Sequence, residues 1–107
     1  MAVISPQFHA QNILGLSHEM YAQAEQGNWA IFSELEAKRQ KIITLLFAYP
    51  HIEVVLEELA STLSQVMAID NKSMMLGEKE KQRLVGEMAG LKLHRQVAQV
   101  YQFVSMN

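Results

Sequence analysis

The sequence lacks cysteine altogether, and its 107 residues include only two prolines and five glycines. Without cysteine the chain can form no disulfide, thiolate zinc site or iron–sulfur cluster, and it has no cysteine nucleophile. The start of the chain, MAVISPQFHAQN, lacks the charged region of a signal peptide. The longest nearly apolar stretch, 42–49, is far shorter than the ~20 residues of a membrane span. We therefore expect a soluble, cytoplasmic protein.

Charge is also scarce, because nine Lys and Arg residues stand against eleven Asp and Glu residues and give a net charge of -2. This balance offers no basic surplus for a nucleic-acid backbone. Eight acidic and three basic residues over 1–71 give -5, whereas three acidic and six basic residues over 72–107 give +3. We interpret the basic group as a solvated face that holds the C-terminal segment on the acidic remainder, with a partner-binding patch as the alternative. The basic residues are Lys72, Lys79, Lys81, Arg83, Lys92 and Arg95.

What the chain has is apolar material, 50% of its residues, with helical periodicity nearly throughout. We predict an all-α fold in one domain over 1–107: an antiparallel bundle of three helices with a short C-terminal fourth helix. Ser5 and Pro6 start the first helix, and Gly27 ends it. Asn28 caps the second helix, and Pro50 stops it. The third helix is expected over 52–88, ending at Gly90, and the fourth over 91–104. The apolar positions of the first helix include Phe8, Ile13, Leu16, Met20 and Ala24, at spacings of three to five residues.

No constellation of catalytic residues is visible, so we predict that the protein is not an enzyme and takes no cofactor or metal. No histidine has a Glu three residues before it, and no two histidines are three or four residues apart. His51 is expected to be exposed, and His94 to pack. Asp70 is the one acid inside an apolar stripe, and we place it at the edge of that stripe. A metal-dependent activity lost on changing His94 or Asp70 would favour an enzyme.

The chain is rich in methionine, a flexible side chain that fills cores and also lines surfaces that accept partners. We expect Met20 and Met67 to fill the core. Met74 and Met75 are adjacent, so at least one is expected near the surface.

The third helix is predicted to be longer than the first and second helices. The fourth helix is expected to fold back as a cover over its projecting part, and a partner helix can displace this cover.

Three segments resemble the FliT type of flagellar export chaperone, from the second helix onward. They are the helix start Gly27-Asn28-Trp29-Ala30-Ile31-Phe32-Ser33-Glu34-Leu35-Glu36, the step Ile69-Asp70-Asn71-Lys72-Ser73, and the terminal helix ending in Val100-Tyr101. The resemblance implies a helical chaperone that binds the C-terminal segment of the filament-cap protein FliD and prevents its premature assembly. It also implies delivery to export ATPase components, binding to the flagellar master transcription regulator, and gating by the terminal helix.

An apolar groove on the second and third helices is the predicted binding site, because a chaperone needs a groove that matches an amphipathic segment. Its candidate residues are Ile42, Leu45, Leu46, Leu63, Met67, Met74 and Met75, and its gate would be Leu93, Val97 and Tyr101. For each groove residue, ordinary core packing is the alternative. For the whole chain, the alternatives are a helical adaptor or regulator of another system and a homodimer that pairs through the long helix.

Overall fold

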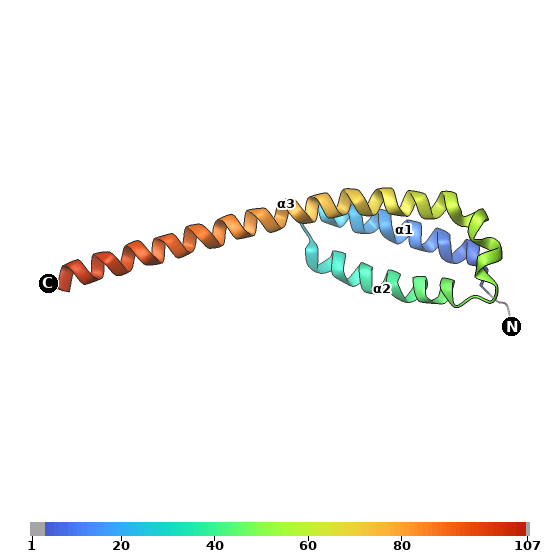
Figure 1. Ribbon diagram of the computed structural model, residues 1–107, viewed down its shortest axis with the longest axis horizontal. Coiled ribbons are helices and arrows are strands. Elements are labelled where there is room, and N and C mark those ends of the chain that lie inside the picture. Colours follow the sequence, from blue (N-terminus) through green and yellow to red (C-terminus); the bar gives the residue numbers. More distant parts are fainter. Residues whose placement is uncertain (1–3, 107) are drawn as a thin grey trace. The chain divides into compact units, whose positions relative to one another are not determined.

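A computed structural model describes the backbone of residues 4–106 and the side chains of residues 4–91. The described chain is helical, with α1 at Pro6–Glu25, α2 at Trp29–Phe47 and α3 at Ile52–Met106, and it contains no strand (Figure 1). It divides into two compact units, Met1–Leu76 and Gly77–Asn107. Unit 1 holds α1, α2 and the first part of α3, and unit 2 holds the rest of α3.

Both ends of α1 follow from the local sequence. The Ser5 hydroxyl accepts a hydrogen bond from the backbone N–H of Phe8 at 3.2 Å, and Pro6 takes the first helical position. At the other end Gly27 has a φ of 75°, which favours glycine. The Gly27 N–H donates to the Ala24 carbonyl at 3.1 Å and the Asn28 N–H to the Gln23 carbonyl at 2.9 Å, the pair of bonds that defines a Schellman motif. The predicted limits of this helix are confirmed.

The turn between α2 and α3 differs slightly from the sequence prediction. The helix α2 ends at Phe47, so Tyr49 lies in the turn before Pro50. His51, in the same turn, carries a φ of 58°, the only positive φ of a non-glycine residue among those described, and it is exposed as predicted.

The start of α2 has no side-chain cap. Asn28 occupies the cap position but makes no capping bond with its side chain, and its amide donates instead to the side-chain oxygens of Gln23 and Gln26.

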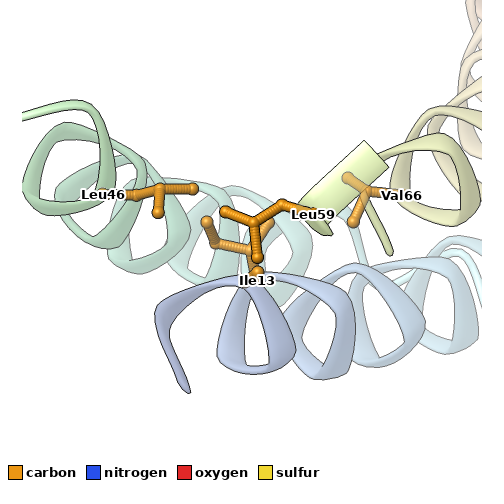
Figure 2. Close-up of a cluster of buried hydrophobic side chains, with 5 residues drawn as sticks. Ile13, Leu46, Leu59 and Val66 are labelled. Atoms are coloured by element: carbon orange, nitrogen blue, oxygen red, sulfur yellow. The ribbon is translucent and has the colours of Figure 1, made fainter. Parts of the chain in front are cut away.

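In unit 1, the three helices lie side by side in alternating directions around a small apolar core (Figure 1). Ile13 from α1, Leu46 from α2 and Leu59 and Val66 from α3 converge there (Figure 2). Full burial of such a side chain contributes about 1.5–3 kcal/mol, so this cluster is the main source of tertiary stability that we identify in the unit. The prediction of three helices in an antiparallel bundle is therefore confirmed for unit 1.

Phe8 is the exception on α1, because 54% of its surface is exposed. It precedes Ile13 by five residues, which places it about 140° around the helix from that core residue. The other apolar positions named for this helix, Ile13, Leu16, Met20 and Ala24, are buried.

A separate fourth helix is not confirmed, because α3 continues through Gly90 to Met106. Gly77, Gly86 and Gly90 all lie inside this helix. A glycine inside a helix costs only about 1 kcal/mol relative to alanine, and it ends a helix when it takes a positive φ. Among the described glycines only Gly27 has one. None of the helices in the described part of the chain is both long and apolar enough to cross a membrane.

Candidate binding surface

The predicted groove residues on α2 divide between the core and the surface. Leu46 is fully buried and belongs to the core cluster, and Ile42 packs against that cluster while half-buried. Leu45, one position before Leu46, turns about 100° away and leaves 56% of its surface exposed. A partner that meets unit 1 as it stands can therefore reach Leu45 but not Leu46.

The same division holds on α3. Leu63 packs against the core, while Met67, Met74 and Met75 are each about two-thirds exposed. Met67 and Met74 are seven residues apart, so they share one face of the helix, and Met75 lies about 100° from Met74. The expectation that Met67 fills the core was wrong, because it follows the buried Val66 and so lies beyond the edge of the core face. The prediction for Met20, which is 1% exposed, is confirmed.

A polar cluster joins the three helices of unit 1. Its member on α3, Asp70, lies between Met67 and Met74 in the sequence. The Nη1 group of Arg39 on α2 donates to the hydroxyl of Ser17 on α1 at 2.8 Å and to Oδ1 of Asp70 on α3 at 2.6 Å. The Ser17 hydroxyl in turn donates to the Ile13 carbonyl at 2.7 Å. The Arg39 side chain is only 12% exposed and that of Asp70 33%, so the ion pair lies between the helices rather than on the open surface.

Sequence reasoning placed Asp70 at the edge of its stripe, which its partial burial confirms, but it missed Arg39. A signal was present: Arg39 lies seven residues before the buried Leu46, on the same face of α2. A base on the inward face of one helix and an acid on the inward face of another predict a pair, because a half-buried charge needs a partner.

The opening of α2, part of the sequence resemblance described above, is held by an aromatic contact. The rings of Trp29 and Phe32 meet edge to face, with centroids 5.3 Å apart. Both side chains are half-buried. An edge-to-face pair contributes about 0.5–1.5 kcal/mol beyond burial, so the contact stabilises the first turn of α2, which has no side-chain cap.

Unit 2 carries further exposed apolar side chains on a helix with its own ion pairs. Arg83 pairs with Glu80 at 2.7 Å and also with Glu87, one turn to either side. The hydrogen bond from Arg83 lowers the pKa of the Glu80 carboxyl and raises the pKa of the guanidinium. Leu84, Val85, Met88 and Leu91 are exposed. The predicted gate residues Leu93, Val97 and Tyr101 lie outside the residues whose side chains the structure describes.

No group of three or more His, Asp or Glu residues is placed to hold a metal ion within the described residues. His9 is buried in α1, while His18 and His51 are exposed on different elements. His94 lies outside the described side chains.

The fold of unit 1 thus defines a helical protein that exposes leucine and methionine side chains on two of its helices. A model of the family "Flagellar protein FliT" matches residues 8–102, and the chain belongs to this family. The match extends over all three helices. No curated protein and no solved structure matches the chain. Family membership supports a role as a flagellar export chaperone and gives no indication of an enzyme.

Proposed function

We propose that the protein is a cytoplasmic chaperone that binds the C-terminal segment of the flagellar filament-cap protein FliD and prevents its premature assembly. The observation that carries the proposal is the family match over residues 8–102. A chaperone of this kind needs no reaction, because covering the apolar face of its client is enough to keep the client from self-association. Exposed Leu45, Met67 and Met74 in unit 1 are available for that purpose.

The surface of the proposed site consists of two kinds of residue. Leu45, Met67, Met74 and Met75 are exposed and would contact the client directly. Ile42, Leu46 and Leu63 pack in or against the core, and they would support the site from below unless the helices move apart. Methionine suits the exposed part because its flexible thioether side chain adapts to different partner surfaces.

The test is co-purification of the full chain with the C-terminal segment of the FliD-type cap protein from the same genome. Replacing Met67 and Met74 by Glu should abolish a one-to-one complex, because two charges would enter an apolar contact. Val54→Glu is the control. Val54 is exposed on the same helix, but it precedes the core residues Leu59 and Val66 in the sequence, whereas Met74 follows them. Absence of a complex with the unmutated chain would contradict the proposal.

A second arm of the same experiment tests the gate, Leu93, Val97 and Tyr101. Removing residues 91–107 should tighten the complex if this segment competes with the client for the apolar surface. Unchanged affinity, with helical content of the remaining chain verified by circular dichroism, would show that the segment is no gate.

Two further partners stay predictions of the family resemblance, the master transcription regulator and components of the export ATPase, and a homodimer that pairs through the long helix stays a separate prediction. Each has its own measurement. Pull-down with the purified regulator or ATPase components tests the first two, and the mass of the protein in solution by light scattering tests the third.

A further inference from the structure

The strength of packing along α3 changes within unit 1. From Ile52 to Val66 the helix contributes apolar side chains to the core: Leu59 and Val66 are buried in the cluster, and Ile52, Val55 and Leu63 pack against it. From Met67 to Leu76 no described residue belongs to that cluster. The buried residue of this second stretch is Ser73, which is 4% exposed. The helix thus joins the core cluster in its first part, whereas the buried residue of its second part is polar.

Two hydrogen bonds give the register of α3 against α1. Near the start of both helices the Gln7 amide donates to the Glu58 carboxylate at 3.1 Å. Arg39 donates to both Ser17 and Asp70, so these two residues also lie near each other. Ser17 follows Gln7 by ten residues on α1, and Asp70 follows Glu58 by twelve residues on α3. The two helices therefore run in the same direction, and Ser73 on α3 comes level with Met20 on α1. Both residues are nearly fully buried, which agrees with this register.

The second stretch of α3 thus lies level with an apolar part of α1. Leu16, Met20 and Ala24 are all buried, although they do not belong to the core cluster that Ile13 joins. If residues 67–76 of α3 moved away, part of this face of α1 would become accessible. The half-buried Ile69 and Leu76, on the same stretch of α3, would be uncovered with it.

When residues 67–76 of α3 lie against the other two helices, two buried polar groups lack a hydrogen-bond partner in the protein. Ser73 Oγ and Arg39 Nε are buried, and neither has a protein partner among the described residues. A buried polar group without a partner costs free energy, which opening recovers because water reaches the group. Opening in turn loses the Arg39–Asp70 pair, and a hydrogen bond to a charged group contributes more than one between neutral groups. The two effects have opposite signs, and the ion pair is the polar contact that favours the closed form.

We propose that Arg39 and Asp70 form a latch, whose release lets residues 67–76 of α3 separate from the α1–α2 hairpin while residues 52–66 stay packed. The open form exposes part of the apolar face that Leu16, Met20 and Ala24 form on α1. The latch is a property of unit 1 and does not depend on which partner the protein binds. Local openings of this kind occur at free energies below that of global unfolding, in segments with few buried apolar contacts.

Native-state amide hydrogen exchange of the full chain, resolved residue by residue by NMR, tests the proposal. Asp70→Asn keeps the shape of the side chain and removes its charge. Exchange at residues 67–76 should become faster by about tenfold or more, while residues 52–63 keep their rates. Glu58→Gln is the matched control, because it makes the same acid-to-amide change in the exposed pair with Gln7 and should leave residues 67–76 unaffected.

Ser73→Ala gives the second arm, with the opposite sign. It removes the buried hydroxyl without touching the ion pair, so exchange at residues 67–76 should slow by about fivefold or more, the equivalent of ~1 kcal/mol. The proposal is overturned if Asp70→Asn accelerates exchange equally in α1, α2 and residues 52–63, which would indicate global destabilisation. It is also overturned if Asp70→Asn has no effect at residues 67–76, or if Ser73→Ala accelerates exchange there.

Discussion

The two units of this chain are both helical, but different forces hold their helices. Unit 1 buries apolar side chains from three helices around Ile13 and Leu46. In unit 2 every described side chain except that of the half-buried Glu80 is exposed, and the helix is supported by the pairs that Arg83 makes with Glu80 and Glu87. The difference shows that helical backbone alone does not indicate a folded core, since most helical stability in proteins comes from packing of an apolar face.

The largest contrast between the units is expected from removing one leucine from each. Leu46→Ala should lower the free energy of unfolding by about 2–5 kcal/mol, because it leaves a cavity in the core. Leu84→Ala should change it by less than about 0.5 kcal/mol, because Leu84 is 45% exposed and lies outside the core. Urea denaturation followed by circular dichroism measures both. Equal losses would show that Leu84 is buried in solution and that the contrast between the units is not real.

Replacing a glycine by alanine should have opposite signs in the two units. Gly27→Ala should destabilise unit 1 by about 1–2 kcal/mol, because a Cβ is strained at a φ of 75°. Gly86→Ala should stabilise the helix of unit 2 by about 1 kcal/mol, since an added Cβ would meet no atom within 4 Å and alanine is the better helix former. The unfolding midpoint in urea measures the first effect, and the Cα chemical shifts of residues 80–90 measure the second. A destabilising Gly86→Ala would mean that the glycine lies in a turn or a close contact.

The smallest effect is expected from the ion pairs of unit 2. Arg83→Gln should lower the helical population of residues 80–87, and added salt should reduce the difference between the variant and the unmutated chain. Arg83 lowers the pKa of Glu80, so the stabilisation is present above the usual carboxyl pKa of 4.5 and is lost as the pH falls through the lowered value. Cα chemical shifts recorded from pH 7 down to pH 3 follow this loss. A variant with the same pH dependence as the unmutated chain would show that the pairs contribute nothing.

The sequence predicted those parts of the fold that depend on neighbouring residues. Ser5 and Pro6 set the start of α1 and Gly27 its end, because caps and left-handed glycines act within one helical turn. The burial of Met20 followed from helical periodicity in the same way. Prediction failed at the margin of an apolar stripe, at Met67, because the period of a helix does not say how wide the buried face is.

The candidate site was harder to predict than the fold. The sequence placed Ile42, Leu46 and Leu63 in one group with Leu45 and the three methionines, but only the contacts between helices separate the packed residues from the exposed ones. The pair of Arg39 with Asp70 joins residues 31 positions apart, and no local rule connects them. A helix end at Gly90 is not confirmed, since α3 continues through it, and the residue type alone does not give the backbone angle that decides whether a glycine ends a helix.

The single nitrogen Nη1 of Arg39 has consequences for how the chain assembles. Its two protons go to acceptors on two different helices, Ser17 and Asp70, so both are placed only when α1 and α3 already lie beside α2. A collapsed chain in which α2 has paired with only one of them, or with a helix from another molecule, would leave part of a guanidinium charge without a partner. Apolar contacts carry no direction, whereas the two bonds of this nitrogen form together only when acceptors from both neighbouring helices are in place.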